Sequence, residues 1–171
     1  MKAEGSGGST QKFRSHEWYM GEALKEARKA YDKDETPVGA VIVKDGKVIA
    51  RGHNEKELKQ DPTFHAEIAA IKKACKKLNS WRLNDCDMYV TLEPCPMCAG
   101  ALIQARLRKL YIGTSDPKAG AAGSVIDVLA VDKFNHMVEV EYGILEDECS
   151  EILKDFFRNL RVRKAKAQCS P

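Results

Sequence analysis

The stretch MYVTLEPCPMCAGALIQARLRKLYIG, residues 88–113, contains two short apolar segments separated by a segment with helical spacing. Residues 88–92 and 110–113 predict strands, because each is short, apolar and bounded by polar or turn-forming residues. Between them, apolar residues recur at helical intervals at Ala99, Leu102, Ile103 and Leu107. A helix between two strands predicts a parallel pair joined by a right-handed crossover, which is typical of α/β proteins.

The residues before this unit predict a helix, a hairpin and a second helix. Ser15 is a candidate N-cap for a helix that ends near Asp32 and has apolar residues at Met20, Leu24, Ala27 and Tyr31. The apolar run 38–43, the turn Asp45-Gly46 and the extended segment 48–50 predict an antiparallel hairpin. After residues 61–63, the next helix has an apolar stripe formed by Ile68, Ile71, Cys75 and Leu78.

The residues after the unit predict one more strand and a long helix. Residues 138–142 are the candidate strand, and a C-terminal helix begins near Asp147. The apolar side of this helix contains Ile152, Leu153, Phe156, Phe157 and Leu160. Together these elements predict an α/β fold with a mixed sheet of about five strands, an N-terminal antiparallel hairpin and helices on both faces.

Length and composition indicate one globular domain. The chain has 171 residues, of which 43% are hydrophobic and 31% charged, and its net charge is only +3, which does not by itself indicate a nucleic-acid-binding protein. We expect a flexible leader or engineered remnant at residues 1–14, a single domain at 15–167 and a short tail at 168–171. The sequence has no signal-peptide core and no membrane-length apolar run, so we expect a cytoplasmic protein.

Two motifs supply the ligands of a metal site. His65-Ala66-Glu67 opens one predicted helix, and Pro94-Cys95-Pro96-Met97-Cys98 opens another. One imidazole and two thiolates suit zinc, and three protein ligands leave the fourth tetrahedral position for water, as in catalytic zinc sites. The partial positive charge of a helix N-terminus favours the thiolate form of the cysteines. Glu67 is then placed to transfer protons.

Three other interpretations of these motifs remain open at this point. A closed structural zinc site would need a fourth ligand, for which Cys86, His53 and His136 are candidates. A redox-active Cys-x-x-Cys pair would leave His65 and Glu67 without a role. Ordinary polar residues at helix starts would explain each residue singly, but not the combination and its order.

The motifs resemble the zinc-dependent nucleobase deaminases, whose signature is His-x-Glu followed by Pro-Cys-x-x-Cys. Within the cytidine/deoxycytidylate deaminase superfamily, the resemblance is to the bacterial tRNA-specific adenosine deaminases. It covers nearly all of residues 15–165 and is carried by TLEPCPMCAG at 91–100, GTSDPKAGAAGS at 113–124 and DFFR at 155–158. The resemblance implies the cytidine deaminase-like three-layer α/β/α fold and a homodimer.

The resemblance also implies the role of each candidate site residue. Zinc would be held by His65, Cys95 and Cys98, with Glu67 as the proton shuttle in the attack of water on adenine C6. The backbone N–H of Ala66 at a helix start is a further candidate for binding the base. The remaining substrate-binding candidates are Asn54 for the target base, Asp116 beside its ribose, and Phe156, Phe157 and Arg158 for the anticodon loop.

The C-terminal end suggests RNA as the substrate. After Asp155 the chain contains no acidic residue, and its cations are Arg158, Arg161, Arg163, Lys164 and Lys166. Such a cluster could contact phosphates, although cations are also favoured at any helix C-terminus. Together with this cluster, the resemblance implies conversion of adenosine to inosine at the wobble position of an arginine tRNA anticodon loop. A guanine or other free-base deaminase and a noncatalytic zinc module that binds RNA are the alternatives.

Overall fold

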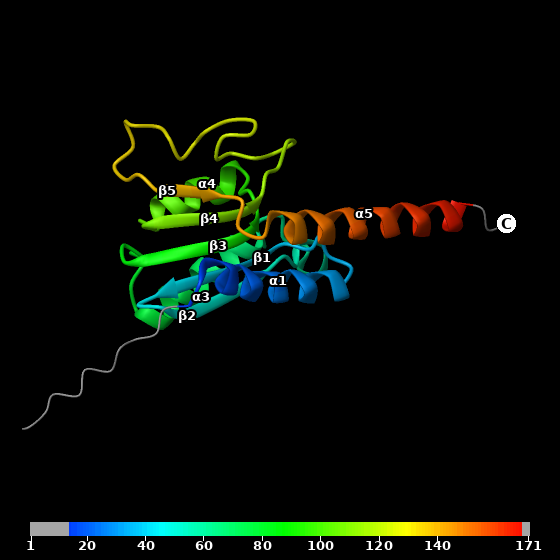
Figure 1. The fold of residues 1–171 in the computed structure, drawn as a ribbon, viewed down its shortest axis with the longest axis horizontal. Coiled ribbons are helices and arrows are strands. Elements are labelled where there is room, and N and C mark those ends of the chain that lie inside the picture. Colours follow the sequence, from blue (N-terminus) through cyan, green and yellow to red (C-terminus); the bar gives the residue numbers. More distant parts are fainter. Residues whose placement is uncertain (1–13, 169–171) are drawn as a thin grey trace, which may run out of the picture.

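The computed structural model describes residues 14–168, which form a five-stranded sheet flanked by helices (Figure 1). The strands are β1 (Gly39–Lys44), β2 (Lys47–His53), β3 (Cys86–Leu92), β4 (Lys109–Thr114) and β5 (Glu139–Tyr142). The helices are α1 (His16–Asp32), α2 (Lys56–Lys59), α3 (Ala66–Leu78), α4 (Pro96–Gln104) and α5 (Glu146–Gln168). The predicted leader and tail lie almost wholly outside the described residues, with only Arg14 and Gln168 inside them.

The sheet is mixed, with strand order β2-β1-β3-β4-β5. β1 pairs antiparallel with both β2 and β3, whereas β4 pairs parallel with both β3 and β5. The predicted N-terminal hairpin and the parallel pair at 88–113 are therefore confirmed. Because β3 and β4 are parallel, α4 has to cross over between them, and it starts directly beyond the C-terminal end of β3.

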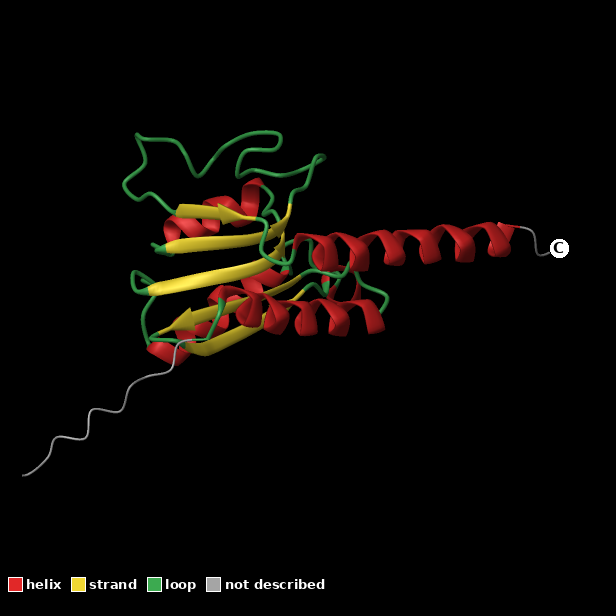
Figure 2. Cartoon of the chain, viewed as in Figure 1, coloured by secondary structure: helices red, strands yellow, loops and turns green. Residues whose placement is uncertain are grey.

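Helices cover both faces of the sheet (Figure 2), as the sequence predicted. One apolar cluster joins the sheet to α1 and α5 through Tyr19, Met20, Ala23 and Cys149. A larger cluster joins the other face to α3 and α4 through Ala66, Ala70, Ala74 and Leu102. The C-terminal part of α5 extends past the body of the domain (Figure 1). No helix among residues 14–168 is both long enough and apolar enough to span a membrane.

The buried face of α3 differs from the predicted stripe. Ile71, Cys75 and Leu78 are only partly buried, and the fully buried residues of this face are alanines. Gly52 of β2 explains the difference, since a Cβ atom there would lie 2.2 Å from the carbonyl oxygen of Ala66 and 2.7 Å from the nitrogen of Ala70. The helix backbone packs directly on the strand, and only small side chains fit between them. This close approach fixes the position of the first turn of α3.

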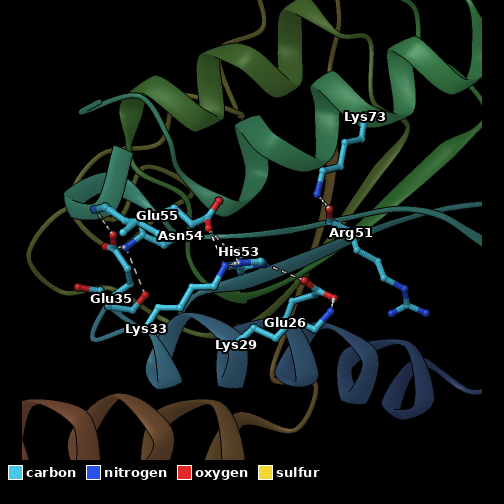
Figure 3. Close-up of polar contacts among 11 residues, drawn as sticks. Glu26, Lys29, Lys33, Glu35, Arg51, His53, Asn54, Glu55 and Lys73 are labelled. Carbon is cyan, nitrogen blue, oxygen red and sulfur yellow. Dashed lines mark hydrogen bonds and ion pairs between the residues drawn. The ribbon is translucent and has the colours of Figure 1, made fainter. Parts of the chain in front are cut away.

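A polar network ties α1 to the end of β2 (Figure 3). His53 Nδ1 lies 2.9 Å from Glu26 Oε2, and Lys33 Nζ lies 3.0 Å from His53 Nε2 and 2.7 Å from Glu55 Oε1. Burial of Glu26 opposes its ionisation, but hydrogen bonds from His53 and Lys29 outweigh that effect and lower the pKa of Glu26 from 4.5 to about 2. The network holds the chain just before Asn54.

We predict that Glu26→Gln makes the free energy of unfolding less dependent on pH in the acid range. The folded-state pKa of Glu26 is depressed, so its contribution is present above pH 4.5 and is lost as the pH falls toward 2. The shift corresponds to roughly 3 kcal/mol at neutral pH. Urea unfolding at pH 7, 5, 4 and 3 should show the parent-to-variant difference shrinking with acidification. Exposed Glu57→Gln serves as the control, and a difference that is constant with pH would contradict the assignment.

Candidate active site

The three predicted metal ligands meet beyond the C-terminal end of β3. His65 is the N-cap of α3, Cys95 is the N-cap of α4, and Cys98 lies one turn into α4. The Sγ atoms of Cys95 and Cys98 lie 3.7 Å and 3.5 Å from His65 Nδ1. Two helices from distant parts of the chain thus point their N-termini at one spot.

The distances and chemistry of these donors fit zinc. Zinc–sulfur bonds of ~2.3 Å and zinc–nitrogen bonds of ~2.0 Å in a tetrahedron put the donor atoms roughly 3.5 Å apart. A hydrogen bond from Cys98, together with His65, lowers the pKa of Cys95 to about 4, whereas its own hydrogen bond to Cys95 and burial raise the pKa of Cys98. Cys95 is therefore a thiolate already, whereas Cys98 has to lose its proton when a metal binds, and a divalent cation would neutralise the two thiolates.

The candidate fourth ligands of a closed structural site lie elsewhere. Cys86 is at the opposite end of β3, His53 contacts Glu26, and His136 Nε2 lies 2.5 Å from the carbonyl oxygen of Leu107. Across residues 14–168, the trio His65, Cys95 and Cys98 is the only group of three or more His, Cys, Asp or Glu residues with ligand atoms all within 4.8 Å of one another. The site therefore has the three-ligand form of a catalytic centre.

Glu67 lies on the first turn of α3, beside the ligands. Its side chain is buried, and burial is the main cause that raises its pKa. A carboxyl group with a raised pKa holds a proton more readily than a solvated one. The arrangement is that of a general acid–base group next to a metal site.

The site opens into a cavity of about 200 Å³ that contains most of the predicted base-binding residues. Asn54, His65, Ala66, Glu67 and Asp116 all line it. Ala66 begins α3, and the first N–H groups of a helix have no partner within that helix, so its N–H is available to a ligand. The volume is below the ~300–1,000 Å³ of typical ligand pockets, which suits one ring system rather than a whole nucleotide.

Asn54 is held in place by a buried carboxylate that the sequence did not single out. Asn54 Nδ2 donates to Glu35 Oε2 and to the carbonyl oxygen of Thr36, at 3.3 Å each, and the backbone N–H of Leu58 donates to Glu35 Oε1 at 2.6 Å (Figure 3). Glu35 is almost fully buried. An acidic residue three positions before the apolar run 38–43 was the available signal, but acidic residues are also common at exposed strand ends.

Asp116 lies on the wall between the cavity and a larger groove. Its Oδ1 accepts hydrogen bonds from the backbone N–H groups of Lys118 and Ala119, so it also stabilises its own turn. The groove measures about 760 Å³ and shares Thr36, Leu92 and Asp116 with the cavity. The two spaces therefore adjoin each other.

The groove is basic and partly apolar. Its cations come from the loop after β4 and from α5, and they are Lys118, Lys154, Arg158 and Arg161. Phe157 is 42% exposed and lines the groove, whereas Phe156 is 3% exposed and packs edge-on against the ring of Tyr31. Adjacent residues on a helix point about 100° apart, so only one of the two phenylalanines can face the groove. Phe156 is therefore too deeply buried to contact RNA.

Comparison with known proteins shows the family. The MafB19-like deaminase family model matches residues 14–161. The chain is 50% identical to a tRNA-specific adenosine deaminase of Bacillus subtilis strain 168 over 152 residues, which cover 89% of this chain and 94% of that protein.

Solved structures agree with this result. One from a study of A-to-I editing by tRNA:A34 deaminases at the wobble position of transfer RNA is 48% identical, has a TM-score of 0.77, and matches over 80% of this chain and 99% of its own. The guanine deaminase of Bacillus subtilis is 43% identical with a TM-score of 0.58, over 60% of this chain and 66% of its own. The chain belongs to the MafB19-like deaminase family and, within it, to the tRNA-specific adenosine deaminases.

Proposed function

We propose that this protein hydrolyses adenosine to inosine at the wobble position of a tRNA anticodon loop. The observation that carries the proposal is that two spaces adjoin: a small cavity lined by His65, Cys95 and Glu67, and a basic groove that shares Thr36, Leu92 and Asp116 with it. The cavity accommodates a base, and the groove accommodates the strand that carries it. The 50% identical relative is named a tRNA-specific adenosine deaminase.

We propose zinc as the metal, with His65, Cys95 and Cys98 as its ligands. When bound, zinc would supply Lewis acidity, which lowers the pKa of a water molecule from ~15.7 toward ~7. Glu67 takes a proton from the attacking water and delivers it to N1 of adenine, so that C6 becomes a better electrophile. Glu67 then takes the remaining proton from the hydroxyl group at C6 and passes it to the leaving nitrogen. The C6–N6 bond breaks, a C6–O bond remains, and ammonia is released.

The polar groups of the cavity orient the base. Asn54 stands at the wall with both hydrogens of its Nδ2 donated to Glu35 and Thr36, so its Oδ1 is left to accept a hydrogen bond from the purine edge. The N–H of Ala66 is directed by the start of α3 and can donate to the substrate. Because these groups are fixed before the substrate binds, little reorganisation is needed during the reaction.

The groove favours a polymer over a free base. Four cations line it against one acid, Asp116, and cations contact phosphates without reading sequence. Phe157 offers an exposed ring on which an unpaired base can stack. A free guanine would occupy only the cavity and would make no use of the groove.

We propose an arginine tRNA as the natural substrate, and the cytoplasm as the place of reaction.

We predict that zinc-loaded protein converts the wobble adenosine of an arginine tRNA anticodon stem-loop to inosine and leaves free guanine unchanged. Base extrusion is least costly for a nucleotide that is already unpaired, as in this loop. Digestion of the RNA followed by chromatography measures inosine, and ammonia release measures action on guanine. Efficient guanine deamination without inosine would move the protein to the free-base enzymes.

Two arginines on α5 provide a matched pair that tests the groove. Arg161 lines it, whereas Arg163 Nη1 lies 2.5 Å from Asp34 Oδ1, outside it. Arg161→Ala should weaken stem-loop binding and reduce the slope of log affinity against log salt by about 1. Arg163→Ala removes the same charge two residues away and should leave that slope close to the parent's. Equal effects of the two variants would contradict a role for the groove.

We predict that Glu67→Gln retains one zinc per chain and loses several orders of magnitude in kcat. The amide stays polar but cannot carry a proton, and general acid–base steps contribute typically ~10²–10⁴-fold each. Metal analysis and single-turnover kinetics measure the two effects, and Cys98→Ser is the control that should lose both metal and activity. If Glu67→Gln turns over within tenfold of the parent, another group carries the proton. If the parent itself binds zinc and RNA but is inactive, the protein is a noncatalytic RNA-binding module.

We propose that the protein is a homodimer whose subunits meet through the loop between β4 and β5. This loop exposes the apolar residues Val125, Ile126, Val131, Phe134 and Met137. Contiguous exposed apolar surface is typical of interaction sites, and homodimers are the commonest assemblies of soluble proteins.

We predict that Phe134→Glu with Met137→Glu converts the dimer to a monomer, because charged side chains cannot be buried unpaired in an interface. Sedimentation equilibrium measures the mass. Val162→Glu, at an exposed apolar position on α5, is the matched control and should remain dimeric. A parent that sediments as a monomer at micromolar concentration would overturn the proposal.

A further inference from the structure

Glu93 is a buried carboxylate that neither the metal site nor the proton transfer uses. It directly follows β3 and precedes the ligand Cys95 by two residues, yet its side chain points to the loop after β4. Its Oε2 accepts a hydrogen bond from the backbone N–H of Asp116 at 2.9 Å and one from the Ser124 hydroxyl. Its Oε1 accepts from the backbone N–H groups of Ala122 and Ser124, at 3.0 and 3.1 Å.

We propose that Glu93 is a positioning residue, which holds loop 115–124 in the shape that receives the RNA strand. The inference rests on the proposed function and deepens it. The loop supplies Asp116 and Ala119 to the cavity, and Asp116, Pro117 and Lys118 to the groove. Glu93 accepts hydrogen bonds from both ends of this loop at once. One side chain therefore fixes the position of the loop that lines both the cavity and the groove.

The surrounding chain is adapted to this carboxylate. At Gly120 a Cβ atom would lie 2.3 Å from Glu93 Oε2 and 2.5 Å from the carbonyl oxygen of Asp116, so the loop can close over the carboxylate only with glycine there. Backbone bonds support the same closure, since Glu93 N–H donates to Thr114 and Ala121 N–H donates to Pro94, each at 2.9 Å. The loop is thereby joined to the turn that carries the metal ligands.

The chemistry of four donors explains why a carboxylate is needed. Both of its oxygens are acceptors, and the three backbone N–H groups can only donate. In Glu93→Gln the amide nitrogen must face at least one of these N–H groups, which leaves a buried donor without a partner. Glu93→Asp keeps both acceptors but shortens the side chain by one methylene. We therefore expect the loop to be held most firmly in the parent, less firmly in Glu93→Asp and least firmly in Glu93→Gln.

The kinetic signature follows from where the loop acts. It contacts the ground-state substrate, so loosening it should raise KM for the stem-loop roughly tenfold or more while kcat changes less. A residue needed only for folding would lower the melting temperature and the active fraction, but would leave the KM of the remaining active enzyme unchanged. A KM for Glu93→Asp that lies between those of the parent and Glu93→Gln would further distinguish positioning of the loop from a role in folding alone.

The experiment compares zinc-loaded parent, Glu93→Gln, Glu93→Asp and Glu141→Gln. The last is a control that breaks the surface ion pair of Glu141 on β5 with Lys109 on β4 and touches no part of the loop. Metal content, stem-loop kinetics and amide hydrogen exchange are measured for each. We expect full zinc in all four, faster exchange at residues 116–124 but not in α4 for the Gln variant, and the KM order given above.

Two results would overturn the proposal. Unchanged exchange at residues 116–124 in Glu93→Gln would show that the carboxylate does not hold the loop, whatever the enzyme's substrate. Faster exchange with an unchanged KM for the stem-loop would show that the loop does not position the RNA. If the parent fails to act on the stem-loop, the proposed function fails, while the exchange result still decides whether Glu93 holds the loop.

Discussion

The structure depends on bringing the first turns of two helices to the same edge of the sheet. The three ligand atoms lie within 4.8 Å of one another, although His65 and Cys95 are thirty residues apart along the chain. Gly52 lets α3 pack backbone-to-backbone on β2, and the parallel pairing of β3 with β4 fixes where α4 begins. A shift of either helix by one turn, about 5.4 Å, would separate the ligands beyond the reach of one metal ion.

Buried acids organise the site in two different ways. Glu67 lies beside the candidate metal ligands, and burial is the main cause that raises its pKa. Glu35 and Glu93 are also buried but accept hydrogen bonds from backbone or amide N–H groups, and those of Glu93 lower its pKa in spite of burial. The direction of the pKa shift of a buried acid therefore depends on the donors around it, and not on residue type or exposure alone.

The division between a small cavity and a larger basic groove matches the energetics of acting on one base of an RNA chain. The groove can bind phosphates of any sequence, while the cavity selects the base through fixed polar groups. α5 contributes to both recognition and packing, because Phe157 faces the groove while Phe156 packs on Tyr31. The acid of the same segment, Asp155, lies 2.5 Å from the Tyr31 hydroxyl and holds α5 against α1.

The sequence by itself determined the order and type of most elements, the mixed sheet with its hairpin, and the grouping of His65, Cys95 and Cys98 as candidate metal ligands. These follow from local patterns: apolar periodicity, turn residues, and ligands at short spacings that one helix turn brings together. The tertiary structure alone decided which face of α3 is buried, which phenylalanine is exposed, and that Glu35 and Glu93 hold Asn54 and the loop after β4. Those properties depend on contacts between residues distant in the chain, and a single acidic residue in a sequence does not reveal whether water or backbone N–H groups will surround it.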